Sequence, residues 1–297
     1  MVRVEEYFAP GSLEEAIDIL NRFGGTARVI AGGTDLIPEL REGAKTPRCL
    51  VDVKRISGLR EIAREGDWLR IGAAVTHAEV AEHPLVRELA TALAEAAAQV
   101  GSPQVRNLGT VAGNVVNAQP AADTAIALVA LGGVLEVASA QGTRLVPVED
   151  CYQGVGVSRI DSTREVVAAV RVRCSAANGG PKYASAFGRL ARRKALALPV
   201  INVAVWVAVE DGVFRDARVA VGPVAPYPFR VRGAEDFLRG QPIAQDTIAR
   251  AAAGAASEAN PRSSPLRGPA DYRREMVEVL VTRALMRCWH FVAVANG

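Results

Sequence analysis

Apolar residues repeat with a helical period near the N-terminus, and an alternation of short helices and strands follows. In residues 12–23, Ser12 and Glu15 stand at the spacing of a capping box, and Ile17 and Leu20 continue an apolar stripe. Glycine follows directly, as is common after the last turn of a helix. This pattern predicts a helix over residues 12–23.

The chain up to residue 173 continues with predicted strands and helices in turn. Thr76 and Glu79 form a second capping box, and the segment 83–100, with proline at its first turn, predicts one long helix. The glycines between 101 and 123 exclude one long helix there. The other predicted elements are a helix at 35–43, a helix followed by two strands at 124–148, and strands at 27–33, 48–53, 68–75 and 164–173.

The pattern of apolar and polar residues changes in the last third of the chain. Residues 175–182, SAANGGPK, are the best candidate for a linker. Beyond them, residues 200–222 alternate apolar and polar positions around Asp211-Gly212, which predicts a β-hairpin with one apolar face formed by Val203, Val205, Val207 and Val209. Three helical stretches follow, at 233–240, 246–259 and 271–291, so we expect a sheet with helices packed on it.

Composition narrows the class of protein. The chain has 297 residues, 49% hydrophobic and 23% charged, which suits one large or two ordinary domains. A net charge of +3 and 5% aromatic residues give no sign of nucleic-acid binding. We find neither a signal peptide nor an apolar run long enough to span a membrane, so we expect a cytoplasmic protein.

Familiar catalytic and metal-binding patterns are missing from the sequence. The four cysteines are far apart, and the three histidines, His77, His83 and His290, have no metal-ligand spacing, so we predict no metal site and no catalytic histidine. GxSxG, HExxH, GxxxxGK[ST] and GxGxxG do not occur. A Rossmann-type hydride-transfer enzyme is therefore disfavoured.

Two glycine turns remain as candidate chemistry, AGGTD at 31–35 and GTVAGN at 109–114. Such turns present backbone N–H groups with little steric cover, and two of them can grip the two phosphates of one dinucleotide, although each alone is more often an ordinary tight turn. Thr34 and Thr110 are extra hydroxyl donors or plain caps, and Asp123 is a helix N-cap or a ligand contact. We expect Gly33→Val to fill this anion cradle.

Several segments, in the same order, resemble the FAD-binding medium subunit of the molybdenum hydroxylases, the family of xanthine dehydrogenase and carbon monoxide dehydrogenase. The first are AGGTDL at 31–36, VDVKRI at 51–56, IGAAVTHAEV at 71–80 and GSPQVRNLGTVAGNVVNAQPAADT at 101–124. The others are RLVPVEDCYQG at 144–154, REVVAAVRV at 164–172, ARVAVGPVAPYPFRVRGAEDFLRG at 217–240 and DYRREMVEVLVTRAL at 271–285. The resemblance covers nearly the whole chain and is more specific than either turn.

The resemblance implies an α+β fold and a set of cofactor-binding residues. The fold is a vanillyl-alcohol-oxidase-type (PCMH-type) FAD-binding domain at 1–176, with lobes at about 1–56 and 57–176, and a C-terminal α+β domain at 177–297 with a three-stranded sheet and helices. The implied FAD-binding residues are Val29, Ile30, Ala31, Gly32, Gly33, Thr34, Asp35, Leu36, Gly109, Thr110, Val111, Ala112, Gly113, Asn114, Asp123, Val167 and Ala168.

This sequence departs from the family pattern at two positions. Ala112 stands where a glycine is usual, and because alanine rarely adopts positive φ, we expect either an ordinary backbone conformation there or a slightly displaced loop. Gly188 stands where some relatives have a lysine, and Arg189, Arg192 or Arg193 is a candidate replacement. The first turn has no histidine for covalent attachment, so the resemblance implies non-covalent FAD.

The implied function is electron transfer within a complex, with no catalytic residue on this chain. Electrons would come from a large subunit with a molybdenum cofactor through a small subunit with [2Fe-2S] clusters, and leave to an acceptor such as NAD or a quinone, in a dimer of heterotrimers. Two alternatives stay open: a stand-alone FAD-dependent oxidase of the same superfamily, for which Tyr272, Glu275 and Asp246 are the available polar residues, and a non-enzymatic nucleotide-binding or scaffold protein.

Overall fold

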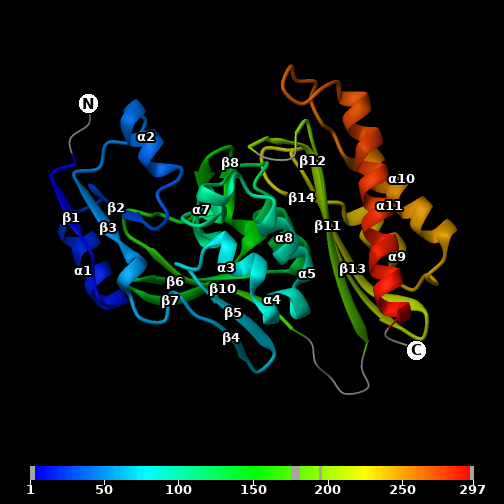
Figure 1. Ribbon diagram of the computed structural model, residues 1–297, viewed down its shortest axis with the longest axis horizontal. Helices are drawn as coiled ribbons and strands as arrows, with labels where there is room; N and C mark the ends of the chain where they lie inside the picture. The colour runs from blue at the N-terminus through cyan, green and yellow to red at the C-terminus, as the bar shows by residue number, and fades with distance from the viewer. Residues whose placement is uncertain (1–3, 175–180, 194–195, 295–297) are drawn as a thin grey trace.

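The computed structural model describes residues 4–174, 181–193 and 196–294. The three larger sheets follow one another along the long axis of the molecule, with the three-stranded sheet at one end and a layer of helices at the other (Figure 1). The sheet order matches the mixed α+β class predicted from the sequence.

The N-terminal lobe is a three-stranded parallel sheet in the order β1-β3-β2, with one helix packed against it. The capping box predicted for its first helix has formed in half, because Ser12 accepts a hydrogen bond from the Glu15 N–H at 3.1 Å. The elements are β1 (Glu6–Phe8), α1 (Leu13–Arg22), β2 (Ala27–Ile30), α2 (Leu36–Glu42), β3 (Cys49–Asp52) and the 3₁₀ turn η1 (Val53–Arg55).

The middle region is built on a five-stranded antiparallel sheet in the order β4-β5-β10-β6-β7. Its strands are β4 (Ile62–Glu65), β5 (Trp68–Gly72), β6 (Val134–Ser139), β7 (Gly142–Pro147) and β10 (Val166–Arg173). The other elements are α3 (His77–Glu82), α4 (Pro84–Leu89), α5 (Thr91–Ala98), α6 (Pro103–Arg106), α7 (Val111–Val116), α8 (Asp123–Leu131), η2 (Val148–Cys151), β8 (Tyr152–Gly154) and β9 (Val157–Ser158). Every residue of α8 is buried, so this helix forms the centre of the region.

The predicted helix over 83–100 is wrong in one respect, because it is two helices, α4 and α5. The break lies at Ala90, whose backbone has ψ 51°. Beside it, the Ala92 N–H donates to the Ser185 hydroxyl at 3.1 Å. A tertiary hydrogen bond thus replaces a helical one, and alanine gives no sign of this in the sequence.

The C-terminal region is a four-stranded antiparallel sheet with helices on one face. Its strands are β11 (Lys182–Ala191), β12 (Pro199–Glu210), β13 (Val213–Gly222) and β14 (Phe229–Arg230), and its helices are α9 (Arg232–Leu238), α10 (Gln245–Glu258) and α11 (Ala270–Val294). The two-residue strand β14 extends the three-stranded sheet that we expected, and it is too short to show an alternating pattern. The β12–β13 hairpin turns at Asp211 and Gly212, both with positive φ, as predicted.

The C-terminal sheet is covered on both faces. Val203, Val205, Val207 and Val209 pack into the core beneath α9–α11, while Ala204 on the same strand belongs to the core of the middle region. Strand β12 contacts α8, and β11 contacts α5. The sheet is therefore a wall shared by the two regions (Figure 1). Most of the linker predicted at 175–182 lies outside the described residues.

Candidate functional site

The two glycine turns lie against each other although Gly32 and Gly109 are 77 positions apart in the sequence. A Cβ atom added to Gly32 would lie 2.1 Å from the Leu108 carbonyl oxygen and 2.8 Å from the Gly109 Cα. No side chain fits at that distance, so glycine is required for the backbones to touch. The predicted convergence of the two turns is present in the structure.

The second glycine of the first turn has a different purpose. Gly33 has φ +70°, a left-handed conformation that favours glycine. Its missing side chain would point at the side chains of Ile30 and Ile37, each 3.2 Å away. One glycine therefore allows a close approach and the other allows a turn, which explains why the two are adjacent.

A cavity of about 810 Å³ opens beside this contact, and a volume of this size is typical of small-molecule sites. Most of the predicted cofactor residues line it: Val29, Ile30, Ala31, Gly32, Gly33, Thr34, Asp35, Leu36, Gly109, Thr110, Ala112, Gly113, Asn114 and Val167. Val111 and Ala168 do not line the cavity and are buried, at 1% and 0% exposed.

The first turn presents backbone donors that no described residue uses. Among the described residues, no hydrogen bond has the N–H of Gly32, Gly33, Thr34 or Asp35 as its donor. The charged residues that line the cavity are mixed: three are basic (Arg28, Lys45, Arg159) and four are acidic (Asp35, Glu39, Asp161, Glu165). An anion bound here would thus be met by main-chain amides rather than by a cluster of cations.

The second turn continues into α7. The Thr110 hydroxyl caps this helix by accepting from the Gly113 N–H at 3.0 Å. Ala112 lies inside the helix and is absent from the residues with positive φ, so the ordinary conformation expected for it is confirmed. Asn114, which also lines the cavity, accepts a hydrogen bond from the Thr124 hydroxyl at 2.7 Å, and this bond joins α7 to α8.

Asp123, the first residue of α8, is not among the residues that line the cavity. Its Oδ1 accepts hydrogen bonds from Arg189 Nε at 3.1 Å and from Asn202 Nδ2 at 2.8 Å, and both partners belong to the C-terminal sheet. Burial raises the pKa of Asp123 to about 6, although Arg189 and Asn202 act in the opposite direction. Its contact with a flavin hydroxyl stays a prediction.

Of the three arginines suggested as replacements for the lysine missing at Gly188, Arg189 is the one that reaches the interior. Its side chain is 6% exposed and forms the buried ion pair with Asp123. Arg192 donates to the Pro265 carbonyl and Arg193 to the Leu196 carbonyl, both at exposed positions. The buried positive charge on this part of β11 is therefore at Arg189, the residue after Gly188.

His77, to which we assigned no catalytic role, lines the cavity. It is the first residue of α3, 2% exposed, and its Nδ1 has no hydrogen-bond partner among the described residues. Burial and the nearby Arg106 lower its pKa to about 4. The sequence held one sign of it, the capping box that begins at Thr76, but no sign that the helix starts at the cavity.

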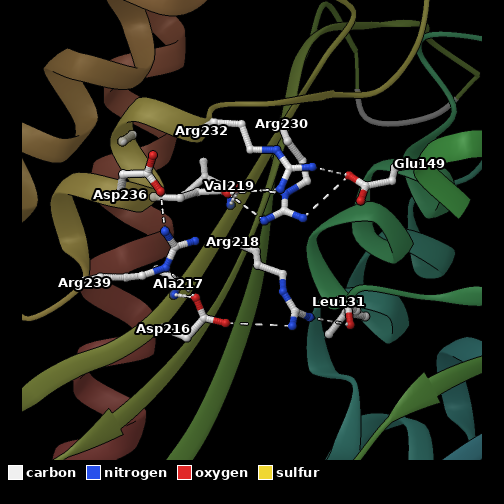
Figure 2. A network of polar contacts seen from close by, with 12 residues as sticks. Leu131, Glu149, Asp216, Ala217, Arg218, Val219, Arg230, Arg232, Asp236 and Arg239 are labelled. Carbon is white, nitrogen blue, oxygen red and sulfur yellow. Dashed lines mark hydrogen bonds and ion pairs between the residues drawn. The ribbon is translucent and has the colours of Figure 1, made fainter. Parts of the chain in front are cut away.

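A second group of contacts joins the other end of α8 to the C-terminal sheet (Figure 2). The guanidinium of Arg218 donates to the carbonyl of Leu131, the last residue of α8, at 3.2 Å and lies over the Trp206 ring. Arg232 pairs with Glu149 of η2 at 2.8 Å. Arginines from the C-terminal sheet thus hold both ends of the helix that supports the site.

The residues that a stand-alone oxidase would need are elsewhere. Tyr272, Glu275 and Asp246 are exposed on α10 and α11, and none lines the cavity. Among the described residues, no three metal-ligating side chains are grouped to hold a metal ion. Within the same ranges, every helix is too short or too polar to cross a membrane.

Comparison with known proteins agrees with this geometry. Residues 2–172 match the family described as the FAD binding domain in molybdopterin dehydrogenase, and residues 186–288 match the CO dehydrogenase flavoprotein C-terminal domain. The chain is 36% identical over 247 residues to the nicotinate dehydrogenase FAD-subunit of Eubacterium barkeri, covering 82% of each chain. It is 31% identical over 284 residues to the carbon monoxide dehydrogenase medium chain of Hydrogenophaga pseudoflava, covering 96% of each.

Solved structures give the same result. A chain of carbon monoxide dehydrogenase from Hydrogenophaga pseudoflava superposes with a TM-score of 0.88 at 31% identity, over 98% of this chain and 99% of that one. A chain of quinoline 2-oxidoreductase from Pseudomonas putida 86 gives 0.85 at 31% identity, over 97% and 98%. This chain therefore belongs to the family of FAD-binding medium subunits of the molybdenum hydroxylases.

Proposed function

We propose that this chain holds FAD non-covalently between its two glycine turns and acts as the electron-transfer subunit of a molybdenum hydroxylase complex. The observation that carries the proposal is the contact between the turns, beside a cavity lined by residues 32–35, whose four N–H groups donate to no described residue. Converging amides suit a diphosphate because they stabilise negative charge without bringing a countercharge.

Each part of the site has a task in this proposal. The amides of residues 32–35 bind the diphosphate, and Thr110 with Gly113 fixes the second turn through the α7 cap. Val29, Ile30 and Val167 supply apolar walls. Asp123 keeps Oδ2 for a flavin hydroxyl, because both hydrogen bonds from described residues end on Oδ1.

The bound flavin supplies redox chemistry: it takes up electrons singly and delivers them in pairs. The chain itself contributes position, exclusion of water and a polar environment. We propose a boundary near residue 176 between the FAD-binding domain, with lobes meeting near 56, and the C-terminal domain.

The remaining parts of the assembly follow the relatives. Carbon monoxide dehydrogenase has a medium chain, and nicotinate dehydrogenase has an FAD-subunit, so both are assembled from several chains. We propose a large subunit with the molybdenum cofactor, a small subunit with [2Fe-2S] clusters, a dimer of heterotrimers in the cytoplasm, and NAD or a quinone as the acceptor.

The test is to purify the full chain alone and with its two partner subunits. Alone, it should be yellow, release FAD on heat denaturation, and oxidise no small alcohol or amine. With the partners, native mass analysis should show one complex that contains molybdenum and iron. A colourless chain, or turnover by the isolated chain, would contradict the proposal.

A further inference from the structure

His77 is fixed at the junction of the two glycine turns by main-chain contacts. Its backbone N–H donates to the Gly109 carbonyl at 2.9 Å, and Thr76 forms a β-bridge with Thr110. These contacts fix the start of α3 relative to the second turn, and so place the backbone of His77 beside Gly109.

The ring and the first turn approach the same small space. A Cβ atom on Gly109 would meet the Thr34 hydroxyl at 3.2 Å and His77 Cδ2 at 3.3 Å. Gly109, Thr34 and His77 all line the cavity. An oxygen atom bound by the first turn beside Gly109 would thus lie within reach of the imidazole edge that carries Cδ2 and Nε2.

The ring lacks the partners that a buried histidine usually has. The residue is 2% exposed, and its Nδ1 is fully buried without a partner among the described residues. No described residue forms a hydrogen bond with Nε2, the ring nitrogen bonded to Cδ2. A buried polar group without a partner destabilises the folded chain, and an apolar side chain of similar size would avoid this penalty. A histidine kept under these conditions, at the wall of a ligand cavity, indicates a partner in the ligand.

The charge state suits a donor to an anion. Burial and the cation of Arg106 hold the pKa of His77 at about 4, so the ring is neutral at physiological pH. A neutral imidazole has one N–H donor and one acceptor nitrogen. It can donate to a phosphate oxygen without the cost of a buried charge.

We propose that His77 is a cofactor-binding residue whose ring N–H donates to the diphosphate of the dinucleotide held by the two turns. The inference rests on the proposed function, namely that the cavity takes FAD. It adds a side-chain donor to a site that otherwise relies on backbone amides.

The experiment measures binding of FAD, ADP and riboflavin to the full chain after its flavin has been removed. The variants are His77→Leu, which keeps the volume and removes both nitrogens, and His77→Gln, whose amide can replace Nε2–H. The matched control is His83→Leu, because His83 also has a buried Nδ1 without a partner but does not line the cavity.

In His77→Leu, we expect the Kd for FAD and for ADP to rise about tenfold, and the Kd for riboflavin to stay within about twofold, because the lost contact is to the diphosphate. His77→Gln should recover most of the loss, and His83→Leu should bind all three ligands as the wild type does. The Tm of flavin-free His77→Leu should equal or exceed that of the wild type.

Three results would overturn the inference while the proposed function stands: wild-type affinity for FAD and ADP in His77→Leu, an equal loss for riboflavin, or a lower flavin-free Tm without rescue by glutamine. The last result would assign His77 a packing role. A wild-type chain that binds neither FAD nor ADP would instead overturn the proposed function, and the inference with it.

Discussion

His77 and Asp123 are both buried ionisable residues at the start of helices in the FAD-binding domain, and they differ in their surroundings. Asp123 accepts hydrogen bonds from Arg189 and Asn202 of the C-terminal sheet, and it does not line the cavity. His77 lines the cavity and has no side-chain partner among the described residues. The interface supplies two partners for Oδ1 of Asp123, whereas the ring of His77 has none from the described residues.

This difference separates two uses of buried polarity. A satisfied pair fixes how two parts of a protein meet, because removing either partner leaves a charge in a low-dielectric interior. A polar group without a partner at a cavity lowers the stability of the empty protein, and it gains a hydrogen bond when the ligand binds. We therefore expect changes near Asp123 to act mainly on folding and changes near His77 mainly on ligand affinity.

The largest expected effect comes from Arg189→Met. It leaves Asp123 buried without its cation, and removing one partner of a buried ion pair typically costs about 3–5 kcal/mol of unfolding free energy. Urea denaturation at pH 8, where Asp123 is ionised, measures the loss. The double variant Arg189→Met with Asp123→Asn should recover much of it, since no unpaired charge remains.

Equal destabilisation in the single and double variants would show that Arg189 acts through contacts other than its pair with Asp123, such as packing and its hydrogen bond to the Ala197 carbonyl. The contrast between Asp123 and His77 would then be wrong, because the stability of the chain would not depend on the ion pair of Asp123. Flavin content, measured in the same samples, should change less than stability.

The second prediction concerns pH, where the two residues act in opposite directions. The pKa of His77 falls from 6.5 to about 4 on folding, so the unfolded chain binds more protons between these values. Protonation of His77 in the unfolded chain therefore lowers the free energy of unfolding as pH falls from 6.5 toward 4. The loss is about 3 kcal/mol, at about 1.4 kcal/mol per pKa unit, and it is absent above pH 6.5. The pKa of Asp123 rises from 3.8 to about 6, so its contribution is lost as pH rises through that window.

Variants should separate the two contributions. Relative to the wild type, flavin-free His77→Leu should gain stability as pH falls from 6.5 to 4, and Asp123→Asn should gain stability as pH rises from 4 to 6. Urea denaturation across this range measures both differences. Parallel curves for the wild type and either variant would contradict the assigned shift.

Much of this fold was predictable from residue pattern, and the site was predictable in part. The capping boxes at Ser12 and Thr76 and the alternation along β12 are local signals, and they gave the correct elements. The break at Ala90 and the ion pair of Asp123 depend on hydrogen bonds from β11 and β12, which no local pattern encodes. The same holds for His77, whose place at the cavity depends on the bridge between Thr76 and Thr110.

The third prediction contrasts the two adjacent glycines beside His77. Gly32→Ala places a Cβ against the Leu108 carbonyl, and it should cost about 3 kcal/mol and most of the bound flavin, because the two turns must separate. Gly33→Ala should cost about 1–2 kcal/mol, through its positive φ and the approach of its Cβ to the side chains of Ile30 and Ile37, and should retain more flavin. Flavin content and urea denaturation measure both effects.

The glycine pair also revises the reason behind the expected effect of Gly33→Val. Its Cβ would face Ile30 and Ile37 rather than the backbone of the second turn, so valine would act through backbone strain and crowding of these side chains. Equal flavin content in the two alanine variants would remove the distinction between Gly32 and Gly33.

The smallest effect is expected at the far end of α8, where the same interface uses a partly exposed contact. Arg218→Met removes the hydrogen bond to the Leu131 carbonyl and the stacking on Trp206, whose ring centre lies 4.4 Å from the guanidinium carbon. The side chain is 28% exposed, and a cation at a helix C-terminus contributes modestly, so we expect a loss of about 1 kcal/mol with flavin content unchanged.

Arg232→Met is the matched control across this interface: its ion pair with Glu149 is 56% exposed on the arginine side and should contribute less than about 1 kcal/mol. If Arg218→Met lowered the free energy of unfolding as much as Arg189→Met, the contacts at the two ends of α8 would stabilise the chain equally. The buried ion pair would then no longer be the feature that distinguishes Asp123.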